Sequence, residues 1–289
     1  MSTAAEEKRP LNLAQAINVA TKDLHDSVNR LVVQRLALGL EDYRLYREGI
    51  KSFYYVYLAF ERTWAKLLSN PATVPPHVYE ILQAISNPQL SRASAIASDL
   101  TYLYGPEVFD PAAPPDRPVR CEVADYIEKT LSEKPHLVLA YTHNFYMALF
   151  AGGKILLRQM LTRKDFFPIR RPASTYDEAQ AFSTNFFVFP VENGKEDGLR
   201  QKYRDAMAHV EGNLSEEETT EIIQESRNIY QINLRLVQEL DEICGSLAIP
   251  PAQPPVGLPG HGGPVAKLRN LLALLVAFVI AVFCLRLLA

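Results

Sequence analysis

The sequence predicts an all-α protein with one helical domain and a C-terminal transmembrane helix. Apolar residues recur at three- and four-residue steps through most of the chain. No run alternates apolar and polar residues as a half-buried strand would, and no period of about 20 to 50 residues repeats. With 289 residues, 48% of them hydrophobic, the chain can bury one full core and still leave a surplus.

Composition excludes several classes of protein. Thirty basic and 33 acidic residues give a net charge of -3, which offers no field for wrapping nucleic acid. The cysteines Cys121, Cys244 and Cys284 form no CxxC pair, so neither a disulfide framework nor a zinc site is indicated. Residues 1–10 are polar and lack the apolar core of a secretory signal. We expect them to be disordered and the domain to face the cytosol.

The helical domain is expected to span residues 11–245. Its first helix, from Leu13 to Leu36, follows Asn12 and Gln15, which form a weak capping box. Seven further helices are expected at residues 42–68, 78–85, 91–104, 122–131, 135–160, 199–209 and 215–245, which makes about eight in all. Aromatic residues of the second helix are expected to be core packing, and residues 182–191 to be an irregular segment tucked across the core.

The helix at residues 135–160 is apolar on nearly every side, which predicts burial among other helices. Yet Gly152 and Gly153 stand side by side in its interior, where each costs about 1 kcal/mol relative to alanine. Glycine pairs bend helices and let backbone approach a neighbour closely. The glycines alone leave two interpretations open: close packing against another helix, or a helix bent over a planar ligand.

Two sets of basic residues also leave alternatives open. Arg200 and Arg204 lie one turn apart on one helix face. Five more basic residues surround the end of the glycine-bearing helix, and they suit either a solvated face or a dock for an acidic partner or anionic lipid: Arg158, Arg163, Lys164, Arg170 and Arg171. A single histidine at the edge of the first helix's apolar stripe, His25, is more often solvated than a ligand.

The C-terminal region predicts a tail anchor. Residues 246–266 are rich in proline and glycine and are expected to be a linker. Residues 267–289 contain an unbroken apolar run from Leu271 to Leu285, preceded by Lys267 and Arg269, which favours a single transmembrane helix with the domain in the cytosol. The short span suits the endoplasmic reticulum membrane or the outer mitochondrial membrane.

Several stretches together resemble the eukaryotic heme oxygenases. TKDLH at residues 21–25, DLTYLYGP at 99–106, the glycine-bearing helix at 135–153 and QKYRDAM at 201–207 occur in the same order and at similar spacing as in that family, and a membrane tail follows. The likeness covers nearly the whole chain. No single motif is decisive, but the ordered set is fairly specific.

The resemblance implies a heme that lies between two helices. It places the iron ligand at His25 and the distal wall, which carries the reaction, at Ala148, Leu149, Gly152 and Gly153. It also implies that the two heme carboxylates meet basic side chains at family positions, which here are Lys22, Arg200 and Arg204. His143 stands where the family usually has a tyrosine near one carboxylate, and Asn18 where it usually has a lysine.

The distal motif departs from the family pattern. The family reads Gly-Asp-Leu-Ser-Gly-Gly, whereas residues 148–153 read Ala-Leu-Phe-Ala-Gly-Gly. The family's aspartate, which holds a water network that supplies protons, is replaced by Leu149. Either another polar group, such as Asn144, organises proton delivery, or the protein binds heme and degrades it poorly.

The resemblance therefore implies a membrane-anchored heme oxygenase. Such an enzyme converts heme to biliverdin, ferrous iron and CO, using O2 and electrons from an NADPH-dependent reductase. Heme is then both cofactor and substrate. Leu149 keeps a second hypothesis open, a heme-binding protein that acts as a sensor, a buffer or a peroxidase-like protein. A third is a tail-anchored regulator of apoptosis, which the absence of an Asn-Trp-Gly-Arg stretch disfavours.

Overall fold

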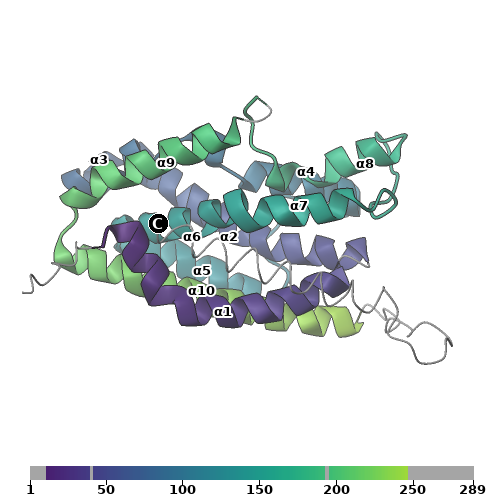
Figure 1. Ribbon diagram of the computed structural model, residues 1–289, viewed down its shortest axis with the longest axis horizontal. Helices are drawn as coiled ribbons and strands as arrows, with labels where there is room; N and C mark the ends of the chain where they lie inside the picture. The colour runs from purple at the N-terminus through teal and green to yellow at the C-terminus, as the bar shows by residue number, and fades with distance from the viewer. Residues whose placement is uncertain (1–10, 40–41, 193–194, 247–289) are drawn as a thin grey trace, which may run out of the picture.

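The structure, a computed structural model, describes residues 11–39, 42–192 and 195–246. Within these residues it contains only helices, which confirms the all-α prediction (Figure 1). The α-helices are α1 (Leu13–Gly39), α2 (Tyr43–Ser69), α3 (Pro76–Ala84), α4 (Ala93–Tyr104), α5 (Pro118–Glu133), α6 (Val138–Ala148), α7 (Lys154–Leu161), α8 (Tyr176–Ser183), α9 (Glu196–Val210) and α10 (Glu216–Ser246).

The predicted tail is not part of this description. The tail anchor at residues 267–289, the linker beyond Ser246 and the N-terminal residues 1–10 lie outside the described residues. None of the helices that the structure does describe combines the length and the apolar character needed to cross a bilayer.

Two differences explain why the described residues hold ten α-helices instead of about eight. The predicted helix at 135–160 is divided: Pro135–Leu137 form a 3-10 turn, α6 follows, and a π-helical turn, η4 (Leu149–Gly153), separates α6 from α7. The other difference is α8, which sequence reasoning missed. A capping box opens it, because the Thr175 side chain accepts from the Glu178 amide while Glu178 accepts from the Thr175 amide.

An aromatic core surrounds the contact between α2 and α6. Tyr57 and Phe60 of α2 lie against Phe145 of α6, and the Phe60 and Phe145 rings are stacked with their centroids 6.0 Å apart. All three side chains are buried. Such pairs contribute beyond the area they bury. The prediction that the aromatic stripe of the second helix is core packing is therefore confirmed.

A buried carboxylate holds a segment of the chain against η4. Asp99 of α4 accepts hydrogen bonds of 2.8 Å from the backbone amides of Asn185 and Phe186. These bonds fix a 3-10 turn, η5 (Asn185–Phe187), and the Phe189 ring that follows it stacks on Phe150 with 4.3 Å between centroids. The expectation that residues 182–191 cross the core is thus confirmed for Phe186, Phe187 and Phe189, all buried, although Phe182 belongs to α8.

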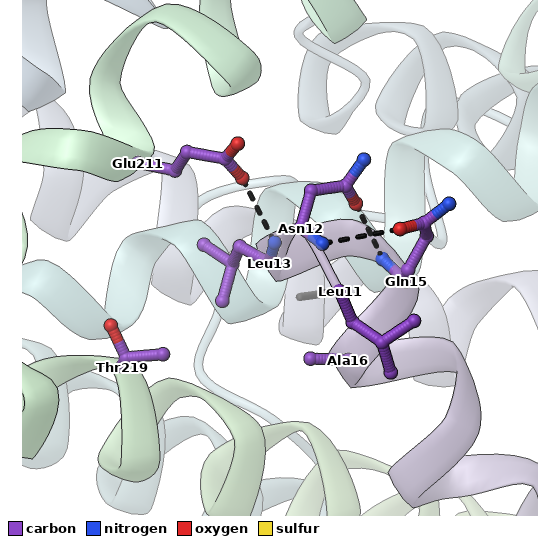
Figure 2. Close-up of a pocket in the computed structure, with 7 residues that line it drawn as sticks. All are labelled: Leu11, Asn12, Leu13, Gln15, Ala16, Glu211 and Thr219. Atoms are coloured by element: carbon purple, nitrogen blue, oxygen red, sulfur yellow. Dashed lines mark hydrogen bonds between the residues drawn. The ribbon is translucent and has the colours of Figure 1, made fainter. Parts of the chain in front are cut away.

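The start of α1 is fastened by three hydrogen bonds. Asn12 and Gln15 exchange side-chain bonds with each other's backbone amides, which confirms the expected capping box. The carboxylate of Glu211 accepts from the Leu13 amide at 2.8 Å, as Figure 2 shows. Because Glu211 comes from the turn after α9, this bond connects α1 to the end of α9. An open depression lies beside the bond (Figure 2).

Further along, α1 is held against α10. The Arg227 guanidinium of α10 forms two ion-pair contacts with Asp23, at 3.0 and 3.1 Å, and also donates to the Ala20 carbonyl. An anion-cation pair with two parallel bonds fixes orientation as well as distance. The position of the middle of α1 along α10 is therefore well defined.

Candidate functional site

A cavity of about 190 Å³ lies where α1, α6 and α9 meet. Its walls include Asn18 from α1, His143 and Met147 from α6, and Arg204 and Met207 from α9. These residues are far apart in the sequence, and hydrogen bonds join the helices that carry them: Glu211 after α9 accepts from Leu13 of α1, and Tyr203 of α9 donates to Thr142 of α6. The cavity therefore belongs to the fold and does not depend on the conformation of one loop.

The polar side of this cavity is built around His143. Its side chain is buried, and its Nε2 lies 3.3 Å from the Asn18 side-chain oxygen, so the ring donates from Nε2 if that nitrogen carries the proton. Burial, together with the nearby charge of Arg204, lowers the pKa of His143 to about 4. At neutral pH the imidazole is thus uncharged, and Arg204 supplies the positive charge at this point.

The glycine pair in η4 has two different environments. A Cβ on Gly153 would come 3.1 Å from a Leu149 methyl carbon and 3.3 Å from the Phe187 ring, so Gly153 allows close packing. A Cβ on Gly152 would meet nothing within 4 Å, and Ala148, one turn earlier, is exposed. Close packing is therefore confirmed for Gly153, whereas Gly152 faces open space, where the interpretation of a helix bent over a planar ligand stays a prediction.

Leu149 belongs to the packed side of η4. It is buried, and its side chain lies against Gly153. The open side of this turn is formed by the small residues Ala148 and Gly152. Leu149 supports that surface from the opposite, packed side. The turn with these two sides, η4, is π-helical. This geometry is uncommon and often occurs at functional sites.

His25 lies further along α1. Its ring is about a quarter exposed and meets the Tyr230 ring of α10 edge-on, with centroids 6.0 Å apart, while its Nδ1 is 3.4 Å from an Asp26 carboxylate oxygen. The Asp26 carboxylate is also paired with Lys22 at 2.8 Å, and the hydrogen bond from Lys22 is the main reason why the pKa of Asp26 is lowered. Lys22 is thus engaged along α1 and is not one of the residues lining the cavity.

His25 and Gly152 are displaced from the cavity in the same direction. Along α1, His25 follows Asn18 by seven residues, and along α6 and η4, Gly152 follows His143 by nine. At about 1.5 Å per residue, these spacings are roughly 10 and 13 Å. Both helices run the same way, toward the end of the molecule that carries α8 (Figure 1). The histidine and the open glycine therefore lie at similar levels along the two helices.

The other expected site residues have mixed outcomes. Arg204 lines the cavity, whereas Arg200, one turn earlier on α9, is not among its lining residues. The Asn144 side-chain amide donates to the Ala140 carbonyl and to the Ser226 hydroxyl, so both of its N–H groups are used inside the protein. Sequence reasoning missed Met147, although its position four residues after His143 places it on the same helix face.

This arrangement suits a flat, mostly apolar ligand with an anionic edge. Ala148 and Gly152 offer a surface without bulky side chains, and Arg204 offers a cation beside a polar, neutral imidazole. An imidazole such as that of His25 is a common ligand for transition metals in its neutral form. Among the described residues there is no group of three or more acidic, histidine or cysteine side chains that could hold a metal ion.

Comparisons with known proteins agree with such a ligand. A family model described as heme oxygenase matches residues 11–239. The heme-binding protein HMX1 of Saccharomyces cerevisiae is 28% identical over 244 residues, which cover 80% of this chain and 76% of that protein. The heme oxygenase of Takifugu rubripes is 24% identical over 261 residues, covering 89% of this chain and 83% of that protein.

Solved structures share the fold. Heme oxygenase-2 from Synechocystis, solved in complex with heme and NO, superposes with a TM-score of 0.63 at 20% identity and covers 91% of this chain and 92% of its own. Heme oxygenase from Leptospira interrogans superposes with a TM-score of 0.62 at 22% identity, covering 79% of this chain and 100% of its own. At these identities the likeness establishes the helical architecture.

Proposed function

Because the chain belongs to the heme oxygenase family, we propose that it binds heme and cleaves it to biliverdin, ferrous iron and CO, using O2 and electrons from an NADPH-dependent reductase. The observation that carries this proposal is the open face at Gly152, at a level along its helix similar to that of His25 on α1. Close helix packing alone would leave no reason for a glycine where a Cβ has room.

The residues present fit heme. The imidazole of His25 would hold the iron, and Ala148 and Gly152 would let the backbone of η4 approach the flat face of the ring. Arg204 would pair with a heme carboxylate, and His143 with Asn18 would accept or donate hydrogen bonds beside it. Heme supplies the redox chemistry when bound, while the protein supplies position, exclusion of water and protons.

Heme binding without turnover is a second candidate function, and one observation favours it. The residues on the open side of η4, Ala148 and Gly152, carry no side-chain group that can hold a proton or order water, and Leu149 is turned toward the core. The Asn144 amide is used by Ala140 and Ser226. Proton supply is therefore the step at which this chain would differ from a proficient enzyme.

Titration of the purified full-length chain with hemin separates these functions. A Soret shift followed by biliverdin formation on addition of NADPH and a reductase supports the enzyme. A stable complex that does not bleach supports the binding protein, and the absence of a Soret shift would refute both. His25→Ala is expected to change the Soret band, whereas His77→Ala, an exposed histidine paired with Glu218, is the matched control and should leave it unchanged.

The glycines provide a second test with an internal control. Gly152→Ala places a methyl group in open space, so it is expected to raise the stability of the heme-free protein by up to about 1 kcal/mol and to weaken heme binding. Gly153→Ala places the methyl group against Leu149 and Phe187, so the gain in helix propensity is offset there. If both variants bound heme as tightly as the wild type, Gly152 would not face the ligand.

The tail sequence supports a proposal for the cellular location. We propose that residues 267–289 anchor the chain in the endoplasmic reticulum membrane, with the outer mitochondrial membrane as the alternative, and that the helical domain faces the cytosol. The apolar run from Leu271 to Leu285 and the basic residues before it support this location. Resistance of the full-length chain to alkaline extraction from membranes, lost when residues 267–289 are deleted, would test it.

A further inference from the structure

The end of α7, the loop that follows it and α8 carry several exposed apolar side chains. Four large apolar residues in this segment are between 39% and 45% exposed: Leu161 of α7, Ile169 of the loop, and Tyr176 and Phe182 of α8. The residues from 158 to 171 contain five basic side chains and a single acidic one, Asp165. We call these four apolar residues, together with Arg158, Arg163, Lys164, Arg170 and Arg171, the α7–α8 surface.

Contacts between its residues and α4 make this surface one connected unit. The Phe182 ring stacks on Tyr102 of α4, with centroids 5.5 Å apart. The Tyr102 hydroxyl donates to the Pro168 carbonyl at 2.8 Å and accepts from the Arg170 amide at 3.1 Å. Phe182 therefore lies beside the residues that flank Ile169.

Other contacts fasten the same surface to the body of the protein. The Gln180 side chain donates to the Arg163 carbonyl at 3.3 Å, which joins α8 to the end of α7. Beneath the loop, Phe166 and Phe167 are buried and both meet the Tyr46 ring of α2. The loop is thus anchored by two buried phenylalanines, whereas Ile169 is exposed.

The surface has a definite place in the molecule. Figure 1 shows α8 and the end of α7 at the same end of the long axis as the C-terminal end of α10. The chain leaves the described domain at Ser246, the last residue of α10. Whatever follows α10 therefore starts from the end of the molecule that carries the α7–α8 surface.

We propose that the α7–α8 surface lies on an anionic lipid membrane, with its exposed basic side chains among the headgroups and its exposed apolar side chains below them. The Arg170 guanidinium is half-buried and donates to the Tyr43 hydroxyl at 3.2 Å, so the other four cations carry this role. This proposal rests on the proposed membrane location of the chain. Basic residues near an anionic leaflet each contribute about 1 kcal/mol, and side chains such as tyrosine and phenylalanine favour the membrane interface. A domain docked in this way would be held in one orientation, and not merely tethered.

An acidic protein partner is the competing occupant, and the composition of the surface disfavours it. The core of a protein interface is depleted of charged residues and has contiguous apolar ones. Here Leu161 and Ile169 are separated along the chain by Arg163 and Lys164. Apolar side chains interspersed with cations suit the membrane interface, where charged headgroups lie above apolar acyl chains.

Hydrogen exchange of the full-length chain on vesicles tests the proposal. The chain is mixed with vesicles of phosphatidylcholine alone, or of equal parts phosphatidylcholine and phosphatidylserine, and floated. Flotation with neutral vesicles reports the tail. Exchange of the backbone amides of residues 162–175 reports the surface. We expect these amides to exchange more slowly on the anionic vesicles than on the neutral ones, while those of α3 remain unchanged.

Charge reversal supplies the control. Arg158→Glu with Lys164→Glu is expected to lower the ratio of docked to undocked domain by about 30-fold or more, and so to reduce the protection, because each lost cation removes about 1 kcal/mol. Lys129→Glu with Lys202→Glu makes the same charge change at exposed sites on α5 and α9 and should leave the protection intact. Leu161→Gln with Ile169→Gln should reduce it without changing the charge.

Each outcome decides one proposal. Flotation with neutral vesicles but equal exchange on both lipids would overturn the docking surface and leave the tail anchor standing. Absence of flotation with neutral vesicles would overturn the tail anchor, and protection on anionic vesicles would still support the surface. Protection that appears only when an acidic protein, such as the soluble domain of a reductase, is added would overturn the lipid assignment in favour of a protein partner.

Discussion

His143 makes the stability of this protein depend on pH in a way that the structure specifies. Its imidazole is buried beside Arg204 and is uncharged in the folded protein, because burial and the arginine lower its pKa from 6.5 to about 4. In the unfolded chain the same imidazole regains its ordinary pKa. Between these two pKa values the unfolded chain binds more protons than the folded chain, so stability falls as pH falls through this window.

The magnitude follows from the two pKa values. The linkage relation gives a loss of about 2 kcal/mol between pH 7 and pH 5, and of about 3 kcal/mol by pH 4. For a domain of ordinary stability this is a large fraction of the total free energy of unfolding. The perturbation that isolates it is His143→Gln, which keeps a hydrogen-bonding side chain beside Asn18 but cannot titrate.

Urea unfolding of both proteins at pH 7 and pH 5 measures the effect. The wild type should lose about 2 kcal/mol more than His143→Gln over this interval. Other groups cancel in the comparison, including Asp99, whose pKa burial raises to about 7. Equal losses in the two proteins, or a His143 imidazole that titrates near 6.5 by NMR, would refute the reasoning.

Heme is expected to raise the pKa of His143, because its carboxylates offset the charge of Arg204.

Three further substitutions test other parts of the structure. Arg204→Gln is expected to raise the pKa of His143, measured by NMR, because the nearby cation helps to lower it. Leu149→Asp should cost about 3 kcal/mol or more in urea unfolding at pH 7, with partial recovery toward pH 5, since it buries a carboxylate between Gly153 and its neighbours. Thr175→Ala removes the cap of α8 and should cost about 1 kcal/mol, whereas unchanged stability would show that α8 needs no cap.

Much of the fold could be predicted from local patterns. Capping residues such as Ser215 with Glu218, and the apolar stripes behind them, fix where helices begin, and both hydrogen bonds of that box are present in the structure. The missed helix α8 had the same signal in Thr175 and Glu178, but its few apolar residues gave no clear stripe. A short helix that depends on packing against its neighbours cannot be predicted from apolar periodicity alone.

The site could be predicted only in part, because its residues depend on distant partners. The resemblance indicated His143 and Arg204, and the structure brings them to one cavity. It also indicated Lys22, which instead pairs with Asp26 four residues away. The different surroundings of Gly152 and Gly153 are set by Phe187, held in place by Asp99 from another helix, and no pattern around residue 152 contains that information.

The two-sided construction of η4 changes how one would redesign it. The residue types allowed at positions 149 and 153 are restricted by packing against the core. Those allowed at positions 148 and 152 are restricted by whatever occupies the open side. The two pairs can therefore vary independently through evolution or in the laboratory. A polar group introduced at Ala148 would reach the solvent side of the turn without disturbing the core, which makes that position the natural entry point for engineering a hydrated pocket.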